Sequence, residues 1–405
     1  MPKAQKTSMI SVKAALSSLI REARAPMSEL CGLEDLNGRI LADDITAQLT
    51  QPPFAASAMD GYAVRFADMK TGARLDIIGE APAGTPFAGH VGAGQAVCIF
   101  TGGAVPHGAD HVIIQEEVTR DNGVIIIDQD QPRARNIRPA GIDFNAGDIL
   151  VTKGTRLGAV SASVFAAANI ARLSVYKRPI VAIFANGDEL QEPGTDLKPG
   201  QIINSNHYAI ATLIKMWGGA VRYLGCAKDN IDAINSMFDA ARDADIIVPI
   251  GGASVGDYDY VKDGFKSVGG DIIFEKVAVR PGKPTWHGRL GAQTILGLPG
   301  NPASAIVTAC VFLKPLIAHM SGGTDFTAYA RALTAAPLPS NGPRETYMRA
   351  TIEPDDDGQL YVRAASKQDS SLLRPFLGGE VLIKRPPHAA ACGTGTRVDI
   401  IHMTR

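Results

Sequence analysis

The chain has 405 residues, 45% of them hydrophobic, which is enough for roughly two to four domains. Its formal net charge of -1 excludes a general electrostatic attraction to nucleic acid or to an acidic membrane surface. Five scattered cysteines without a C-x-x-C pair argue against a structural zinc site and a disulfide framework. Residues 1–8 are polar and we find no run long enough to span a bilayer, so we expect a cytoplasmic protein.

The N-terminal segment predicts an amphipathic helix and then a polar loop. Ser11–Arg24 places its apolar residues on one helical face behind a Ser cap. After the Pro52-Pro53 break comes a small-residue loop, Ser57–Val64, that carries Asp60. Asp60 is either a turn former or a site residue, and the loop pattern leaves both interpretations open.

Residues 74–128 contain short apolar runs separated by Gly and Pro, which is typical of a small β domain. Thr101-Gly102 directly follows one of these runs, so its hydroxyl and amides could bind a ligand or form a plain β-turn. An Ala-rich helix at Leu157–Ile170 and a linker at Tyr176–Pro179 follow. The linker predicts a domain boundary near residue 175.

From Ile180 to Met320 predicted strands and helices alternate, which indicates a three-layer α/β domain with a mainly parallel sheet. The predicted strands are Ile180–Phe184, Ala220–Leu224, Ile246–Ile250, Ile272–Phe274 and Thr294–Leu298, and the predicted helices are His207–Met216, Ile231–Arg242, Tyr258–Val268 and Pro302–Met320. In such sheets ligands bind beyond the carboxyl ends of the strands. We therefore expect the site in the loops that follow these strands.

The loop after Ile246–Ile250 is the strongest of these candidates. Gly251, Gly252 and Gly256 allow close backbone approach, so the amides around Ser254 could receive a phosphate. Asp257 and Asp259 follow at i, i+2 and could hold a divalent metal ion beside that phosphate. A tight turn and an ordinary Asp helix cap are the alternatives.

Two further segments of this region favour anions. Alternation places Lys276 and Arg280 on one face of an extended segment, and Lys283 lies on a Pro-Gly-Lys-Pro turn, which favours an oxyanion site. After the last strand, Asn301 suits a helix cap and Pro302 a first turn, so Ser304 is expected near a helix N-terminus.

From about residue 325 short strands separated by turn residues predict an all-β C-terminal domain. Arg349 and Ser371 are candidate site residues there; the alternative for each alone is an ordinary polar side chain on the protein surface.

Seven motifs in order resemble the molybdopterin molybdenumtransferase family, MoeA in bacteria and the C-terminal domain of gephyrin in animals. They are Ser57–Ala63, Thr101-Gly102, Arg138–Asp143, Gly187–Leu190, Gly251–Asp259, Pro281–Pro284 and Leu298–Ser304. The resemblance covers residues 9–403. It implies four domains: an elongated N-terminal one (1–52 and 146–175), an inserted small β domain (53–145), an α/β molybdopterin-binding domain (176–324) and a C-terminal β domain (325–405).

The resemblance also implies a reaction and an assembly. In this family adenylylated molybdopterin and molybdate give molybdenum cofactor and AMP in a Mg²⁺-dependent reaction. The implied enzyme is a homodimer, with each active site between the α/β domain of one subunit and the inserted domain of the other. Further implied partners are the molybdopterin adenylyltransferase and cofactor-accepting proteins. Neither nucleic acid nor a membrane is an expected partner. A scaffold or carrier that binds molybdopterin without turnover is the alternative.

The family's site residues carry over position by position. The implied metal ligands are Glu189, Asp257 and Asp259. The implied catalytic residues are Asp60, Thr101, Asp143, Glu189, Asp259, Lys276 and Arg280. The implied substrate-binding residues are Gly251, Gly252, Ser254, Gly256, Lys283, Pro299, Asn301, Pro302, Ser304, Arg349 and Ser371. The chain departs from the family pattern at Ala185-Asn186, Pro249-Ile250 and Asp369, which removes hydroxyl donors and adds a carboxylate.

Overall fold

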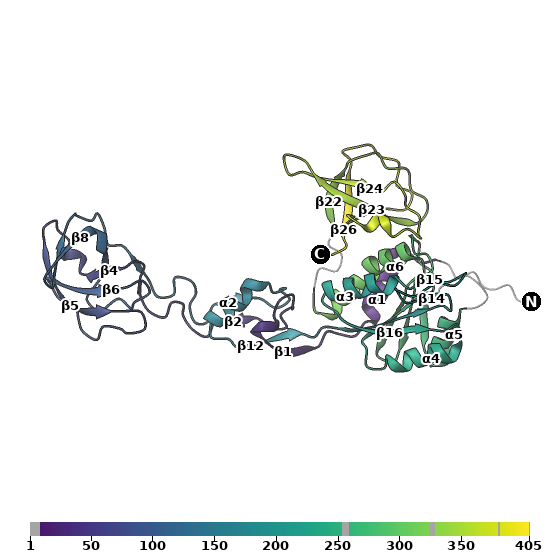
Figure 1. Ribbon diagram of the computed structural model, residues 1–405, viewed down its shortest axis with the longest axis horizontal. Helices are drawn as coiled ribbons and strands as arrows, with labels where there is room; N and C mark the ends of the chain where they lie inside the picture. The colour runs from purple at the N-terminus through teal and green to yellow at the C-terminus, as the bar shows by residue number, and fades with distance from the viewer. Residues whose placement is uncertain (1–8, 253–258, 324–328, 380, 405) are drawn as a thin grey trace, which may run out of the picture.

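The computed structural model describes residues 9–252, 259–323, 329–379 and 381–404. Figure 1 shows an elongated molecule, with a small β region at one end, a narrow middle region, and an α/β region beside a second β region at the other end. Each of the three large regions contains a six-stranded sheet. This arrangement confirms the predicted multidomain fold class.

The α/β region is built on a sheet of strand order β16-β13-β17-β21-β20-β18. Its strands are β13 (Ile180–Asn186), β16 (Ala220–Ala227), β17 (Ile246–Ile250), β18 (Asp271–Phe274), β20 (Trp286–Leu290) and β21 (Gln293–Gly297). Strands β16, β13, β17 and β21 are parallel, β20 runs antiparallel to β21, and β18 runs antiparallel to β20 and so points the same way as the parallel strands. Strand β20 was not predicted, because Gly288 and Arg289 interrupt its short apolar pattern.

Helices cover both faces of this sheet. They are α3 (Asn206–Met216), α4 (Ile231–Ala240), α5 (Tyr260–Ser267) and α6 (Pro302–Thr308), which continues through a π-helical turn (Ala309–Leu313) into α7 (Lys314–Met320). Alternate residues of β13 bury on opposite faces, with Val181 and Ile183 in one hydrophobic core and Ala182 and Phe184 in the other. The predicted three-layer architecture follows from this alternation.

The N-terminal helix α1 (Val12–Glu22) begins at Ser11, whose side chain accepts a hydrogen bond from Ala14 N, as the predicted cap requires. Its buried residues Val12, Ala15 and Leu19 belong to the core of the α/β region. The helix therefore packs away from the elongated region in which residues 1–52 were expected. Its apolar face packs against the α/β core, where α1 contacts α7.

Residues 302–320 form, within the described chain, one helical run long and apolar enough to cross a membrane by length and composition alone. This corrects the expectation that no run reaches that length. Because 83% of the run's most apolar window is buried inside the molecule, the helix has the character of a core element.

The middle region pairs β1 (Ser28–Gly32) with β12 (Arg172–Tyr176) and β2 (Ile45–Thr46) with β11 (Ile149–Val151), and α2 (Ala159–Ala167) packs against them. Strands β3 (Ala56–Ser57) and β10 (Ile137–Arg138) join it to the inserted β region. That region contains β4 (Gly61–Val64), β5 (Arg74–Ala81), β6 (Gln95–Ile99), β7 (His111–Ile114), β8 (Val118–Asp121) and β9 (Val124–Ile127). Two short strands after β13, β14 (Leu190–Gln191) and β15 (Ile202–Ile203), pair in parallel. Four 3₁₀ turns lie at Leu33–Asp35, Phe66–Asp68, Gln115–Glu117 and Arg374–Phe376.

The C-terminal sheet contains β19 (Val279–Arg280), β22 (Ala330–Thr334), β23 (Glu345–Pro354), β24 (Leu360–Ala364), β25 (Val381–Arg385) and β26 (Arg397–His402). Strand β19 comes from the α/β region and pairs with β23. Near the C-terminus, Trp217 Nε1 donates to Met403 O and Lys314 Nζ donates to His402 O, both at 2.7 Å. These contacts hold the C-terminal sheet beside the α/β region.

Candidate active site

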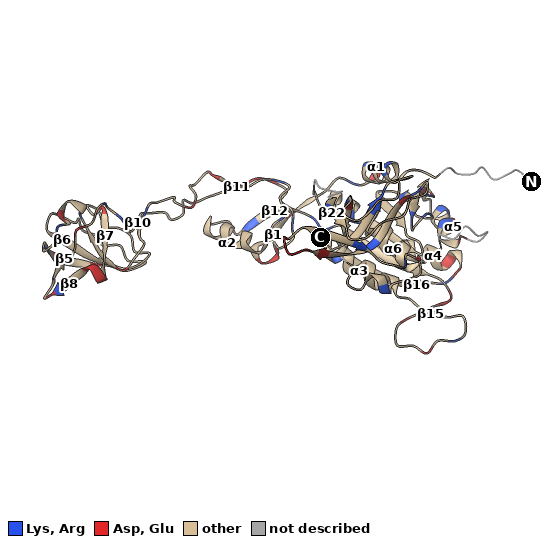
Figure 2. Ribbon diagram, turned by 90° about the horizontal axis from the view of Figure 1, so that it is seen from above, with Lys and Arg blue, Asp and Glu red and all other residues tan. Residues whose placement is uncertain are grey.

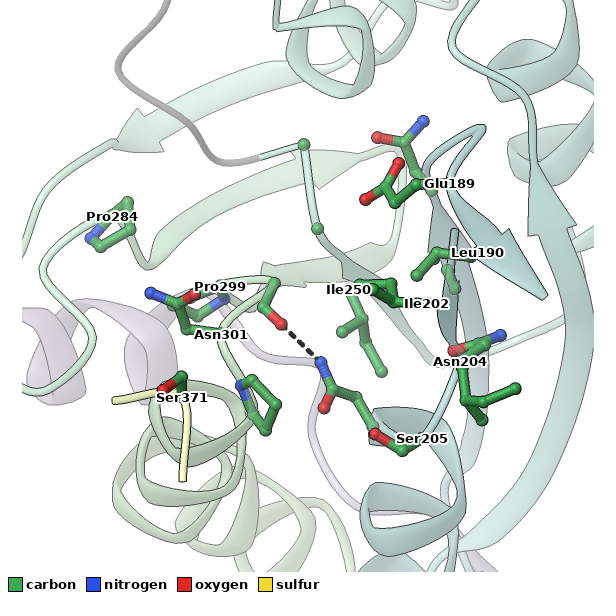
Figure 3. Close-up of a pocket in the computed structure, with 18 of the residues that line it drawn as sticks. Glu189, Leu190, Ile202, Asn204, Ser205, Ile250, Pro284, Pro299, Asn301 and Ser371 are labelled. Atoms are coloured by element: carbon green, nitrogen blue, oxygen red, sulfur yellow. Dashed lines mark hydrogen bonds between the residues drawn. The ribbon is translucent and has the colours of Figure 1, made fainter. Parts of the chain in front are cut away.

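A cavity of about 700 Å³ lies at the carboxyl ends of β13, β17 and β21, where the sheet topology places three neighbouring parallel strand ends together. Figure 3 shows its walls converging from β13, β15, β17, the loop after β21 and the C-terminal region. The lining residues are Ala185, Asn186, Glu189, Leu190, Ile202–Asn206, Ile250–Gly252, Lys276, Lys283, Pro284, Pro299–Pro302 and Ser371.

The cavity wall after β17 is a glycine pair that no larger residue can replace. A Cβ at Gly251 would lie 2.8 Å from Asn186 O, and one at Gly252 would lie 2.3 Å from Val261 Cγ2. Both glycines also have positive φ, 102° and 63°. The wall therefore stays free of side chains at these two positions, although Gly251 is buried and its N–H donates to Leu298 O at 3.1 Å. Ser254, Gly256 and Asp257 lie outside the described residues.

Two lysines give the cavity positive charge. Lys276 and Lys283 both line it, and neither side chain has a hydrogen bond or ion pair with another described residue. The turn that carries Lys283 is fixed by Val277 N donating to Lys283 O at 3.0 Å. Gly282, at φ 113°, packs so tightly that a Cβ there would lie 2.1 Å from Thr308 Cγ2. Arg280, predicted on the same face, is exposed on β19 and does not line the cavity.

The predicted metal ligands are placed differently from one another. Glu189 lines the cavity, and its side chain makes no hydrogen bond or ion pair with another described residue. Asp259 instead caps α5, accepting from Lys262 N at 3.2 Å, and pairs with Lys262 Nζ at 2.8 Å. Over the described ranges no group of three His, Cys, Asp or Glu side chains could hold a metal ion.

The C-terminal region contributes Ser371 to the cavity wall, beside Asn301 in Figure 3. Arg349 does not line the cavity: it is 2% exposed, and its guanidinium donates to Gln368 Oε1 at 3.2 Å and to Leu372 O at 2.8 Å. Its role in the described chain is to shape the loop that carries Ser371. Ser304 is likewise buried and does not line the cavity, whereas Pro299, Asn301 and Pro302, which are predicted to bind substrate, do line it.

Asp60, Thr101 and Asp143 lie far from this cavity in the same chain. Asp60 and Thr101 are at the start of β4 and the end of β6 in the inserted region, at the opposite end of the molecule in Figure 1. Thr101 donates to Asp60 Oδ1 from its N at 2.7 Å and from its Oγ1 at 2.8 Å. These bonds hold the pKa of the Asp60 carboxyl below its ordinary value. Asp143 is exposed on the connector, where its N donates to Gln51 O.

Two polar cavity residues, Asn204 and Asn206, were missed from the sequence. Asn206 Nδ2 donates to Gly300 O at 2.6 Å, the dashed line in Figure 3, and so ties α3 to the loop after β21. Asn186 Nδ2 donates to Asp229 Oδ1 at 2.6 Å. Behind the wall Asn204 Nδ2 donates to Tyr223 Oη at 2.8 Å, and burial raises the pKa of that phenol, which stays neutral. The polar run after the short apolar pair Ile202-Ile203 was the signal available for Asn204 and Asn206.

Three family descriptions match the chain in order. "MoeA N-terminal region (domain I and II)" matches residues 10–169, "Probable molybdopterin binding domain" matches 182–319, and "MoeA C-terminal region (domain IV)" matches 331–403. A Haemophilus influenzae protein named molybdopterin molybdenumtransferase is 33% identical over 97% of this chain and 98% of its own length. A protein of the same name from Nostoc sp. is 36% identical over 85% of this chain and 82% of its own.

A solved structure agrees with this match over the whole length. The molybdopterin biosynthesis MoeA protein from Pyrococcus horikoshii superposes with a TM-score of 0.83, at 29% identity, over 98% of this chain and 99% of its own. The relatives cover nearly all of this chain, 97% in sequence and 98% in structure. The chain therefore belongs to the MoeA family.

Proposed function

We propose that the protein is a molybdopterin molybdenumtransferase, which inserts molybdate into adenylylated molybdopterin and releases AMP. Its relatives from Haemophilus influenzae and Nostoc carry that name. The observation that carries the proposal is the cavity, which is lined by Lys276, Lys283 and Glu189, side chains without an ion pair to another described residue, and by the glycine pair after β17. Cations and backbone amides are the groups that bind oxyanions and phosphates.

The described cavity residues divide into two proposed parts. Lys276, Lys283 and Ser371 would bind molybdate, and Asn301 and Pro302 would shape that side of the wall. Gly252, which lines the cavity and is half-buried, would receive a phosphate of the adenylylated substrate through its backbone, whereas the Gly251 N–H already donates to Leu298 O at 3.1 Å. Ser304, Arg280 and Arg349 would act from outside the wall, Arg349 by holding the loop of Ser371.

Magnesium is the proposed cofactor, and the test of fit is the carboxylate of Glu189, which lines the cavity and makes no ion pair with another described residue. Mg²⁺ is commonly bound through one or two protein carboxylates together with substrate phosphates, so a preformed cluster of three ligands is not required. Glu189 and Asp259, with Asp257 beyond the described residues, would hold it. Bound there, the ion would neutralise charge on the pyrophosphate.

A homodimer is proposed because the predicted site residues are divided between distant regions. Asp60 and Thr101 lie at the opposite end of the chain from the cavity (Figure 1), so one chain of this shape does not bring them to it. A second copy could supply them, in the isologous arrangement that is common for dimers. Further proposals are a cytoplasmic location, which the five free cysteines favour, and contacts with the adenylyltransferase and cofactor-accepting proteins.

The experiment is AMP release from adenylylated molybdopterin by the purified protein, with and without molybdate and with and without Mg²⁺. Release that requires both is the expected result. Binding of the intermediate without any cleavage would contradict the transferase and favour a carrier. Cleavage that needs molybdate but no divalent ion would remove only the magnesium assignment.

A further inference from the structure

The hydroxyl of Ser371, which lines the cavity, is already engaged. Ser371 Oγ lies 2.6 Å from Asp369 Oδ1, and Ser371 N donates to the same oxygen at 2.9 Å. An ionised carboxylate only accepts hydrogen bonds, so the serine must be the donor in both contacts. These two bonds, the hydroxyl first, hold the pKa of the exposed Asp369 below its ordinary value, so it is ionised at neutral pH.

The loop around Ser371 is anchored from two sides. Arg349 Nη1 donates to Leu372 O at 2.8 Å, and Gln368 Nε2 donates to Arg349 O at 3.0 Å. On the other side Ala303 N donates to Ser370 O at 2.9 Å, which joins the loop to the start of α6. Because the loop is held at both sides, the availability of the Ser371 donors depends on Asp369 and not on a movement of the loop.

We propose that Asp369 is a positioning residue that sets the affinity of this cavity for tetrahedral oxyanions by occupying both donors of Ser371. The inference rests on the proposed function, in which Lys276, Lys283 and Ser371 bind molybdate. When the two lysines attract a tetrahedral dianion, the N–H and O–H of Ser371 already donate to the Asp369 carboxylate. The dianion must displace the Asp369 carboxylate or bind without the serine, and the carboxylate charge opposes its approach.

The test variant is Asp369→Asn in the full chain. Asparagine keeps an acceptor for the Ser371 backbone N–H, so the local turn is retained, while the charge is removed and the hydroxyl bond is weakened. We expect the molybdate concentration for half-maximal AMP release to fall by about tenfold, the usual worth of a hydrogen bond to a charged group. The half-saturating concentration of adenylylated molybdopterin should stay unchanged. Asp369→Ser serves as a second variant if the first folds poorly.

A matched control is Asp130→Asn. Asp130 Oδ1 accepts from Thr71 N at 2.7 Å and from Thr71 Oγ1 at 2.8 Å, the same pair of contacts in the inserted β region. This variant should leave the molybdate dependence unchanged. A double-mutant comparison adds a second test, since Ser371→Ala should raise the molybdate requirement severalfold more in the Asp369→Asn background than in the wild type.

Binding of molybdate alone to the full chain, measured by calorimetry, separates this inference from the proposed function. Tighter molybdate binding by Asp369→Asn supports the inference even if the wild type releases no AMP, a result that would contradict only the transferase. An unchanged or weaker molybdate affinity of Asp369→Asn overturns the inference. The proposed function still stands in that case if the wild type releases AMP in a molybdate-dependent reaction. An equal effect of Ser371→Ala in both backgrounds also overturns the inference.

Discussion

Asp259 Oδ2 lies 2.8 Å from Lys262 Nζ, and the two side chains are only 15% and 13% exposed. The same carboxylate caps helix α5 through Lys262 N. Asp259 therefore has a structural role in the described chain, and its proposed role as a metal ligand requires the carboxylate to leave the lysine. The two roles can be separated because they depend on different chemistry.

The first prediction is that Asp259→Asn lowers Mg²⁺-dependent AMP release by about 100-fold or more, while α5 still forms. Asparagine caps a helix about as well as aspartate, so the start of the helix is retained. It is a poor substitute for a carboxylate toward Mg²⁺. Activity over a Mg²⁺ titration and circular dichroism measure the two effects separately.

Lys262→Met is the control for that variant, since it removes the ion pair and keeps the carboxylate. If Asp259 binds the metal, this variant should stay active and need less Mg²⁺, because the carboxylate no longer has a competing cation. Equal losses of activity in the two variants would assign Asp259 a purely structural role in the ion pair.

The second prediction concerns Lys283, which lines the cavity without an ion partner among the described residues. Lys283→Ala should raise the half-saturating molybdate concentration by about 10- to 100-fold, the worth of a hydrogen bond to a charged group. The requirement for adenylylated molybdopterin should change much less. Lys266→Ala, at an exposed position on α5, is the control and should change neither. Equal effects of Lys283→Ala on both substrates would move the lysine to the phosphate side.

Sequence periodicity predicted the strand ends that border the cavity, because strand ends follow directly from apolar runs. The run Ile246–Ile250 matches β17 residue for residue, and the glycines after it line the cavity. The alternation around Val277 and Val279, both fully buried, correctly turned Lys276 outward. Periodicity could not predict whether an individual side chain lines the cavity or is buried behind its wall. The Arg349 guanidinium donates to Leu372 O, and Asp259 forms an ion pair with Lys262. Contacts of this kind leave no recognisable pattern in the sequence.

The sequence pattern also could not predict contacts between residues that only tertiary packing brings together. Asn206 reaches the cavity because α3 packs beside the loop after β21, 94 positions away in the chain. The family resemblance implied that helix α1 belongs to the elongated region, whereas its apolar face packs on the α/β core. Amphipathic spacing identifies a buried face but not the surface that covers it.

The third prediction is a pKa change at Asp60. The backbone N–H of Thr101, and next its hydroxyl, hold the pKa of this carboxyl below its ordinary value. A lowered folded-state pKa stabilises the folded protein above the unfolded-state value, and this contribution is lost as pH falls through the folded value. Thr101→Val keeps the N–H bond and removes the hydroxyl, so the Asp60 pKa should rise toward its ordinary value in an NMR titration.

Asp130 provides the internal control for that titration. Its pKa is lowered in the same way by Thr71, so it should not move in Thr101→Val. An Asp60 pKa that is unchanged in the variant would mean that the hydroxyl contributes nothing to the shift.

The last prediction tests whether two copies share one site. In the proposed homodimer Asp60→Asn disables the inserted region and Lys283→Ala disables the cavity, so each variant alone should be a poor enzyme. A mixed dimer has one site in which both defects meet and one site with neither. Random pairing of co-expressed variants should therefore recover about a quarter of wild-type activity.

This recovery has a geometric cause, because the cavity and the Asp60–Thr101 pair lie at opposite ends of one chain. Co-expression of Lys276→Ala with Lys283→Ala is the control, since both defects lie in the same cavity and every pairing leaves both sites altered. AMP release per subunit is the measurement. Recovery in the first mixture but not in the second establishes a shared site. No recovery in either mixture would place Asp60 outside the site, and the inserted β region would then need another role.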